Sequence, residues 1–298
     1  MRAFITGGRG FVAGHLQAHL VEQGDEVVAL DKADGFDICD AELTHHTLAD
    51  ARPDVVYHLA ALAHVGESWQ SPAAVFRVNV EGTFNVVEAA RACGASRVVV
   101  AGSAEEYGRG TDPHALRHED TQPEPLSPYG VTKAASGLIA RQAFLAHGLG
   151  AIHVRPFNHT GTGQPPQFVA PALARRIVDA ERTGADHIAV GNVDPVRELL
   201  DVRDVVRAYR LLAERGEPGE TYNIARGQGY TVREIAETLL SFASTPIRLE
   251  VDPALVRPVE VPALVGDPAK LAAATGWSPR YELADTLRAV YDAARAAQ

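Results

Sequence analysis

Tyr129 and Lys133 stand four residues apart in the stretch Ser127-Pro-Tyr-Gly-Val-Thr-Lys133. Ser127 followed by proline is a helix-start signal, so we expect a helix over residues 128–147 with Tyr129 and Lys133 on one face. A tyrosine with a pKa of about 10 exchanges protons poorly at neutral pH. An ammonium one turn away is expected to lower that pKa. The spacing therefore predicts proton transfer by Tyr129.

Ser103 follows an expected parallel strand over residues 97–102. Its hydroxyl would lie at the carboxyl end of that strand, which is where sheets of this kind bind ligands. From there it can hydrogen-bond both a substrate oxygen and the hydroxyl of Tyr129. Ser103 is thus a candidate partner of the tyrosine.

A glycine-rich turn opens the chain, with the sequence Thr6-Gly-Gly-Arg-Gly-Phe-Val-Ala-Gly-His-Leu16 between an apolar strand pattern and a helical pattern. Gly7 permits a tight turn, and Gly10 lets a pyrophosphate approach the N-terminus of the helix. Asp31 follows about 20 residues later, at the end of the second expected strand, where an acid can bind ribose hydroxyls. The arrangement predicts a dinucleotide site. The alternative is a glycine-rich turn in an unrelated α/β protein.

The elements that must position these residues alternate between apolar runs and helical patterns. Continuous β-branched runs such as Val98-Val99-Val100 are typical of parallel strands buried on both faces. The expected strands are 2–6, 26–31, 54–59, 97–102 and 151–156, and the expected helices are 11–23, 72–93 and 128–147. This order predicts an α/β fold with a doubly wound parallel Rossmann sheet. Little helix is expected in the second crossover, because few residues separate Asp31 from Asp40.

The rhythm changes after residue 158, where proline and glycine cluster. The expected helical segments are 168–183, 202–214, 231–243, 268–275 and 282–297, and residues 221–225 are expected to return to the sheet. We therefore predict a dinucleotide-binding Rossmann domain and a smaller interleaved C-terminal substrate lobe. The first comprises residues 1–158 and 198–225, and the second comprises residues 159–197 and 226–298.

The composition excludes several classes of partner. The 298 residues carry a net charge of −10, which argues against nucleic acid or an anionic membrane as partner. Cys39 and Cys93 are the two cysteines and form no metal-binding pattern, so we expect a reduced compartment and no metal site. The first residues are expected to form a strand rather than a signal peptide, and no apolar run is long enough to span a membrane. A cytoplasmic enzyme is expected.

An anionic ligand of such an acidic chain needs locally placed cations. Arg197 and Arg257 lie in the second half of the chain, and a guanidinium matches phosphate oxygens in a bidentate way. The alternative for Arg197 is a structural ion pair with Glu198 or Asp201.

Six motifs together resemble the extended short-chain dehydrogenase/reductase family that acts on nucleotide sugars, and the similarity runs nearly end to end. They are TGGRGFVAGHL (6–16), HLAA (58–61), NVEGT (79–83), AGSAEEYG (101–108), SPYGVTK (127–133) and RPFNHTG (155–161). Two later segments, VRELLDVRDVVRAY (196–209) and RPVEVPALVGDPAKL (257–271), resemble the GDP-mannose branch. That branch includes GDP-mannose 4,6-dehydratase and GDP-4-keto-6-deoxymannose reductase.

The resemblance implies roles for individual residues. The catalytic residues would be Ser103, Tyr129 and Lys133, with Glu105 matching the glutamate that removes the C5 proton in the dehydratases. The dinucleotide would be bound by Gly7, Gly10, Phe11, Val12, Asp31, Lys32, Asp37, Ile38, Leu59, Ala60, Ala61, Tyr129, Lys133 and Pro156. The nucleotide sugar would be bound by Asn158, Arg197, Arg257 and Glu260, and His159 is a candidate pocket residue beside the nicotinamide. An alternative for the acidic pair is that Glu105 or Glu106 only caps a loop.

The cofactor expected is NAD. Asp31 stands where NADP-using members of the family carry a Ser/Arg pair, and a carboxylate there repels a 2′-phosphate. Arg9 and Lys32 could still neutralise such a phosphate, so NADP is the alternative.

The expected reaction is reduction of GDP-4-keto-6-deoxy-D-mannose at C4 by hydride transfer from the nicotinamide. The alternative keeps the fold and makes the chain a GDP-mannose 4,6-dehydratase or a nucleotide-sugar 4-epimerase, with NAD recycled within the turnover. A non-catalytic dinucleotide sensor is a third interpretation, which the intact Ser103, Tyr129 and Lys133 disfavour.

A homodimer is expected as well, because two helices carry more apolar residues than one sheet face needs. They are Val75, Val78, Val86 and Val87 in 72–93, and Leu138, Ile139, Phe144 and Leu145 in 128–147. Members of the family pair these helices around a two-fold axis.

Overall fold

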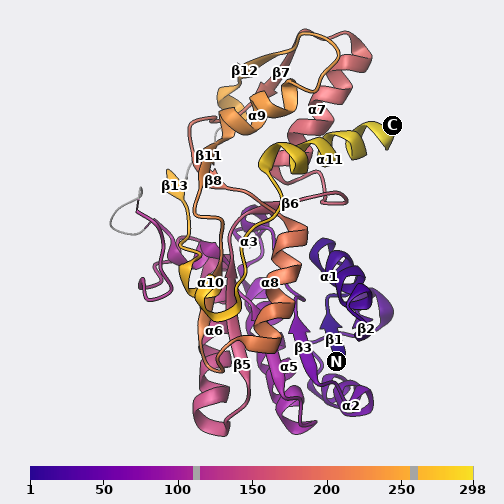
Figure 1. Cartoon of the computed structure of the whole chain (residues 1–298), viewed down its shortest axis with the longest axis vertical. Coiled ribbons are helices and arrows are strands. Elements are labelled where there is room, and N and C mark those ends of the chain that lie inside the picture. The colour runs from indigo at the N-terminus through magenta and orange to yellow at the C-terminus, as the bar shows by residue number, and fades with distance from the viewer. Residues whose placement is uncertain (110–114, 256–260, 298) are drawn as a thin grey trace.

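A computed structural model of the chain describes residues 1–109, 115–255 and 261–297 (Figure 1). Its centre is a parallel sheet of six strands in the order β10-β5-β4-β3-β1-β2. The strands are β1 (Arg2–Thr6), β2 (Glu26–Leu30), β3 (Val55–His58), β4 (Arg97–Ala101), β5 (Ala151–Pro156) and β10 (Thr221–Ile224). The predicted doubly wound sheet is confirmed, including the return of the chain at residues 221–224.

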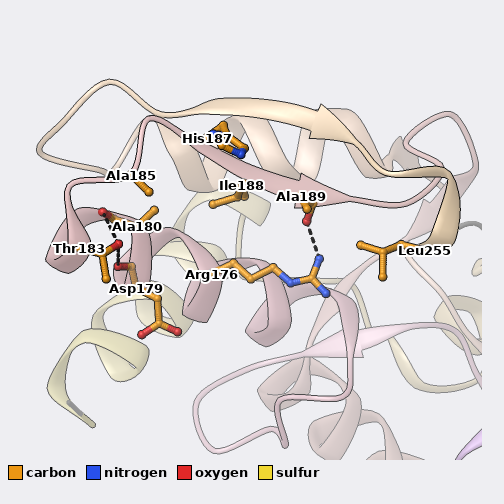
Figure 2. Close-up of a pocket in the computed structure, with 9 residues that line it drawn as sticks. All are labelled: Arg176, Asp179, Ala180, Thr183, Ala185, His187, Ile188, Ala189 and Leu255. Carbon is orange, nitrogen blue, oxygen red and sulfur yellow. Dashed lines mark hydrogen bonds between the residues drawn. The ribbon is translucent and has the colours of Figure 1, made fainter.

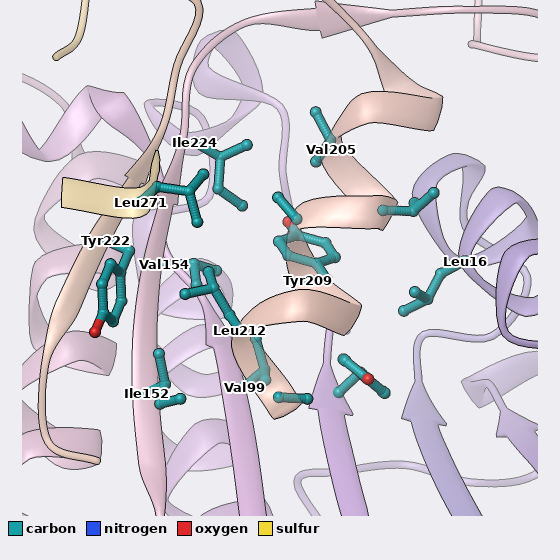
Figure 3. Close-up of a cluster of buried hydrophobic side chains, with 14 of the residues drawn as sticks. Leu16, Val99, Ile152, Val154, Val205, Tyr209, Leu212, Tyr222, Ile224 and Leu271 are labelled. Atoms are coloured by element: carbon teal, nitrogen blue, oxygen red, sulfur yellow. The ribbon is translucent and has the colours of Figure 1, made fainter. Parts of the chain in front are cut away.

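Helices cover both faces of this sheet. One face carries α1 (Phe11–Glu22), α8 (Val202–Arg215) and α10 (Ala269–Thr275), and the other carries α2 (Ala41–Ala51), α5 (Gly82–Ala92) and α6 (Pro128–His147). Figure 3 shows Tyr209 and Leu212 of α8 packed toward Val99 and Val154 of the sheet. The inner strands are thus buried on both sides, which is why β3 and β4 read as nearly continuous apolar runs, whereas the edge strand β2 is only partly buried.

The second crossover differs from the expectation. A short 3₁₀ turn, η1 (Lys32–Asp34), follows β2, and the 11-residue helix α2 comes after it. Asp40 begins this helix, since its carboxylate accepts a hydrogen bond from the backbone N–H of Leu43 at 3.0 Å. The expectation of little helix was wrong because the helix starts beyond Asp40 rather than before it.

The expected helix over 72–93 is not regular. It consists of α4 (Pro72–Phe76), a π-helical turn η2 (Arg77–Glu81) and α5. The wide turn holds the buried Asn79, whose side chain bonds the backbone N–H of Leu62 at 2.8 Å and the hydroxyl of Thr132 at 3.0 Å. Single π turns of this kind are frequent at functional sites. Here the turn ties the loop after β3 to α6.

The second lobe lies beyond the carboxyl edge of the sheet, at the top of Figure 1. Its core is formed by α7 (Val169–Thr183), α9 (Val232–Leu240) and α11 (Leu283–Ala296). Short strands complete it: β6 (His159–Thr160), β7 (His187–Val190), β8 (Val196–Glu198), β9 (Leu200–Asp201), β11 (Gly229–Thr231), β12 (Arg248–Val251) and β13 (Ala263–Leu264). The remaining short turns are α3 (Val65–Ser68), η3 (Ala104–Tyr107) and η4 (Pro253–Leu255). Within the described part of the chain, no helix combines the length and apolarity needed to cross a membrane.

Candidate active site

Two chain segments bring Ser103 and Tyr129 together at the carboxyl end of β4. Ser103 begins the turn η3, and its hydroxyl accepts a hydrogen bond from the backbone N–H of Glu105 at 3.1 Å. Ser127 begins α6 in the same manner, accepting from the N–H of Gly130 at 3.0 Å, with Pro128 in the first helical turn. The side chain of Ser103 lies close enough to the hydroxyl of Tyr129 to act on its pKa. The structure therefore brings the two residues together.

Lys133 lies one turn along α6 from Tyr129 and is buried. Its Nζ donates a hydrogen bond to the carbonyl of Ala101 at 2.7 Å and lies 5.8 Å from the centroid of the Tyr129 ring. Burial lowers the pKa of Lys133 to about 8, while the negative charge of Glu106 acts in the opposite direction. The ammonium is thus held close to its point of deprotonation.

The pKa of Tyr129 does not follow the expectation. Burial raises the pKa of this hydroxyl above its ordinary value, the hydrogen bond with Ser103 acts to lower it, and the charges of Glu105 and Glu106 raise it further. The predicted lowering by Lys133 was wrong for this structure, because burial outweighs the ammonium and Lys133 bonds a backbone carbonyl. A tyrosine that keeps its proton is suited to donate one.

The two adjacent glutamates have different surroundings. Glu105 is partly exposed, and its charge acts on Tyr129. Glu106 is fully buried, and its carboxylate accepts a hydrogen bond from the backbone N–H of Ser103 at 2.9 Å. The loop-capping alternative therefore applies to Glu106.

The glycine-rich turn has the geometry that a dinucleotide needs. Gly7 has a φ of +72°, and a Cβ there would lie 2.8 Å from Cα of Ala60. Gly10 begins α1 without a side-chain cap, so the N–H groups of the first turn remain available to an anion. The hydroxyl of Thr6 accepts a hydrogen bond from the N–H of Ala60 at 3.2 Å and fixes the neighbouring loop. These residues fit a bound pyrophosphate.

Charged groups surround Asp31 at the far end of this site. Asp31 accepts hydrogen bonds from the backbone N–H groups of Ala33 at 3.2 Å and Arg9 at 3.4 Å. The guanidinium of Arg9 pairs with Asp34. Lys32 pairs with Asp37 at 2.8 Å. Both cations that could receive a 2′-phosphate are thus already paired with carboxylates.

The other predicted dinucleotide residues gather along the carboxyl edge of the sheet. Ile38 is buried, and its side chain occupies the space beside Gly82. The ring of Phe11 stacks on His159 with centroids 6.4 Å apart. The remaining residues adjoin the ends of strands or the first turn of α1: Val12, Leu59, Ala60, Ala61 and Pro156. The sequence indicated His159 as a pocket residue. Its stacking on Phe11 could not be predicted, because the contact depends on how the two lobes pack together.

The predicted sugar-binding residues are only partly described. Asn158 is partly buried, and its carbonyl accepts the N–H of Leu200 at 2.9 Å. Arg197 lies in β8, where its Nη1 donates to the carbonyl of Val196 at 2.9 Å. Arg257 and Glu260 lie outside the described residues.

The carboxylates of Glu198 and Asp201, the alternative ion-pair partners of Arg197, have hydrogen bonds of their own. Glu198 is buried and accepts the backbone N–H groups of Gly227 and Gly266 at 3.2 and 2.9 Å. Asp201 bonds the guanidinium of Arg203 at 2.7 Å and the hydroxyl of Thr286 at 2.9 Å. Both carboxylates therefore have other partners in the structure.

A shallow hollow of about 390 Å³ lies in the second lobe, away from these residues. Figure 2 shows it between α7 and β7, with Arg176 donating to the carbonyl of Ala189 at 2.7 Å. Its lining is mainly apolar and includes Ile188 and Leu255. It contains none of the predicted catalytic side chains.

Comparison with known proteins agrees with this geometry. Residues 32–290 match the family described as GDP-mannose 4,6 dehydratase. GDP-6-deoxy-D-mannose reductase of Pseudomonas aeruginosa is 34% identical over 97% of this chain and 95% of its own length. The RMD structure from Pseudomonas aeruginosa, complexed with NADPH, has a TM-score of 0.90 and 33% identity, and covers 100% of this chain and 99% of its own. UDP-glucose 4-epimerase of Thermus thermophilus, complexed with NAD, has a TM-score of 0.89 and 28% identity, with 100% coverage of both chains.

The predicted enzyme class is confirmed by these relatives, which are nucleotide-sugar enzymes solved with NADPH or NAD. The nucleotide turn, the Ser103–Tyr129 pair and the match over most of the length all point to one assignment. The chain belongs to the GDP-mannose 4,6-dehydratase family of the extended short-chain dehydrogenases/reductases.

Proposed function

We propose that this protein reduces the C4 ketone of a GDP-4-keto-6-deoxy-hexose, with GDP-4-keto-6-deoxy-D-mannose as the substrate. The observation that carries the proposal is the similarity to a GDP-6-deoxy-D-mannose reductase along nearly the whole length of both chains. The site supports it, because burial raises the pKa of Tyr129, which favours its protonated form, and Ser103 lies beside it.

The residues have distinct tasks in this reaction. A bound nicotinamide dinucleotide supplies the hydride that forms the new C4–H bond. Ser103 orients the ketone oxygen, and Tyr129 donates its proton to that oxygen as negative charge develops on it. Lys133 holds the nicotinamide ribose through its ammonium group. Asn158, Arg197, Arg257 and Glu260 are proposed to hold the nucleotide sugar.

A direct test supplies GDP-mannose with and without a separate GDP-mannose dehydratase, together with NADH or NADPH. The products are followed by mass spectrometry of the sugar nucleotide. A reductase yields a GDP-6-deoxyhexose only when the dehydratase is present. Loss of water from GDP-mannose with this protein alone would instead support the dehydratase alternative, which the matched family model also favours.

Glu105→Gln separates the two reactions further, because the substitution keeps the size of the side chain and removes its basicity. A dehydratase must abstract the C5 proton, so it should lose about 10²–10⁴-fold in turnover and stop exchanging that proton with D₂O. A reductase needs only a hydride at C4 and a proton on its oxygen. We expect the variant to lose less than about tenfold. Steady-state turnover and proton exchange at C5 distinguish the outcomes, and a large loss in both would refute the reductase assignment.

We also propose a homodimer formed by the outer faces of α5 and α6. Leu138, Leu145 and Phe84 on these helices are 72%, 67% and 51% exposed. Not all of the residues that the sequence predicted for the dimer contact are available to it. Val86 and Val87 are buried in the core of their own subunit. The dimer therefore depends on a smaller set of side chains than the sequence indicated.

Leu138→Asp combined with Leu145→Asp is expected to convert the dimer into a monomer of 31.8 kDa. Two buried carboxylates in an apolar contact should weaken association by about 100-fold or more. Light scattering at micromolar concentration measures the mass. Val21→Asp is the matched control, because Val21 is another largely exposed apolar residue (62%), on α1. A wild-type protein that is monomeric under these conditions would overturn the dimer.

The domain division and the cytoplasmic location given by the sequence remain predictions.

A further inference from the structure

A buried carboxylate, that of Glu106, lies behind the turn that carries Ser103. One of its oxygens, Oε1, accepts the backbone N–H of Ser103 at 2.9 Å and lies 3.1 Å from Nε2 of His153. The other, Oε2, accepts Nε of Arg155 at 2.8 Å. One side chain thus joins the turn after β4 to two side chains of β5.

The cluster fits only because two neighbouring positions of the backbone are glycines without a side chain. A Cβ on Gly102 would overlap Nε2 of His153 and Oε1 of Glu106. A Cβ on Gly137 of α6 would lie 2.6 Å from Cε1 of His153. The arrangement is therefore specific to two glycines that flank the catalytic residues in the sequence and in space.

Further polar groups hold the cluster in place. The guanidinium of Arg155 also donates to the hydroxyl of Tyr107 at 3.0 Å and to the backbone carbonyl of Glu119 at 3.1 Å. The Tyr107 hydroxyl in turn donates to the side chain of Asn223 in β10 at 2.6 Å. The carboxylate of Glu106 is thus fixed from β5 and from its own turn, and Arg155, which holds it, is linked through Tyr107 to β10.

The charge of Glu106 persists at neutral pH. Burial acts to raise the pKa of this carboxyl, but His153, Arg155 and the N–H of Ser103 together hold it below its ordinary value. The other titratable groups nearby are Glu105 and Tyr107 on the same turn, Tyr129 and Lys133 on α6, and His58 of β3, on which the charge of Lys133 acts. Lys133 and Glu106 bond the same short segment, because Nζ of Lys133 donates to the carbonyl of Ala101 at 2.7 Å and Glu106 accepts the N–H of Ser103, two residues further on, at 2.9 Å. The negative charge of Glu106 raises the pKa of Lys133 against the effect of burial.

We propose that Glu106 is a positioning residue of this active site: its carboxylate fixes Ser103 opposite Tyr129, and its negative charge keeps the buried ammonium of Lys133 charged. The inference deepens the proposed function, on which it rests for the roles of Ser103, Tyr129 and Lys133.

Two substitutions separate the two parts of this role. Glu106→Gln keeps an oxygen within reach of the Ser103 N–H and removes the negative charge. Glu106→Asp keeps the negative charge, but the side chain is one methylene shorter and its carboxylate no longer reaches the Ser103 N–H in the same way. The matched control is Asp204→Asn, which neutralises another fully buried carboxylate that pairs with an arginine, Arg207, at 2.8 Å.

The charge of Lys133 can be followed without any turnover. The chain contains three lysines, Lys32, Lys133 and Lys270, so ¹³C-labelled lysine gives few NMR signals, and loss of one in Lys133→Arg assigns Lys133. The wild-type Lys133 should titrate near its pKa of about 8. In Glu106→Gln this midpoint should fall by about one pH unit, whereas Glu106→Asp and Asp204→Asn should leave it near the wild-type value.

Turnover supplies the second measurement. Lys133 must be charged for the reaction, so the alkaline limb of the kcat profile should move to lower pH in Glu106→Gln, with kcat near wild type below that limb. In Glu106→Asp the limb should stay in place and kcat should fall by about 10- to 100-fold, because Ser103 is misplaced. Thermal unfolding checks that each variant is folded.

An unchanged Lys133 midpoint in folded Glu106→Gln would overturn the electrostatic part. Wild-type kcat in Glu106→Asp would overturn the positioning part, and this variant decides it even if Glu106→Gln fails to fold. If the wild-type protein does not reduce the proposed sugar, the proposed function fails, and the NMR titration still decides the effect of Glu106 on Lys133.

Discussion

Tyr129→Phe is expected to lower turnover by about 10²–10⁴-fold while leaving the affinity for the dinucleotide nearly unchanged. The substitution removes the hydroxyl that lies beside Ser103 and keeps the buried ring. The reduced ketone oxygen then lacks its proton donor at the moment when negative charge develops. Steady-state kinetics and NADH fluorescence measure the two quantities separately.

Tyr222→Phe is the matched control for this experiment. Tyr222 is a buried tyrosine of β10 whose hydroxyl accepts a hydrogen bond from the N–H of Glu217 at 3.0 Å. Loss of that hydroxyl should cost some stability and little turnover. Near-normal turnover in Tyr129→Phe would remove this residue from the mechanism, and an equal loss in both variants would indicate a general effect on the fold.

NADH is expected to bind about 100-fold more tightly than NADPH. A 2′-phosphate would lie against Asp31 and near Asp34, and repulsion between a phosphate and a carboxylate at a partly exposed site amounts to about 3 kcal/mol. Arg9 and Lys32 do little to offset it, because they pair with Asp34 and Asp37. Titration of protein fluorescence with each cofactor gives the two dissociation constants.

Asp31→Ser combined with Asp34→Asn should remove most of this preference, since the first change removes the facing carboxylate and the second releases Arg9 to bind a phosphate. Asp186→Asn, which neutralises an exposed acid of the second lobe, should leave the preference unchanged. Tighter binding of NADPH by the wild-type protein would show that Arg9 and Lys32 act as a phosphate clamp despite their pairing.

Much of the fold could be predicted because the sheet is buried on both faces. Runs such as Val98-Val99-Val100 mark parallel strands directly, and Ser127-Pro128 marks the start of α6. That Tyr129 and Lys133 lie on one face of α6 followed from the period of that helix. Helix α2 was not predicted, because the segment from Asp31 to Asp40 is too short for it and the helix begins only after that segment.

The surroundings of the site were harder to predict. Glu105 and Glu106 are neighbours of the same type, and only the 3₁₀ turn at Ser103 decides which of them is buried. His153 and Arg155 lie on β5, about 50 residues away in sequence, so their contacts with Glu106 depend on the pairing of β4 with β5. The pKa of Tyr129 depends on burial, which the i, i+4 spacing does not report.

Strand β10 has a consequence for how the chain folds during its synthesis. It pairs with β5, yet β5 ends at Pro156 and β10 begins at Thr221, so α7 and α8 leave the ribosome before the sheet can be completed. Until then β5 presents an unpaired apolar edge, the kind of strand edge that recruits other chains. The nucleotide-binding half therefore does not mature first as an independent unit. Completion of its sheet has to wait until the segment between β5 and β10 has been made, which makes premature truncation within residues 157–220 a route to aggregation.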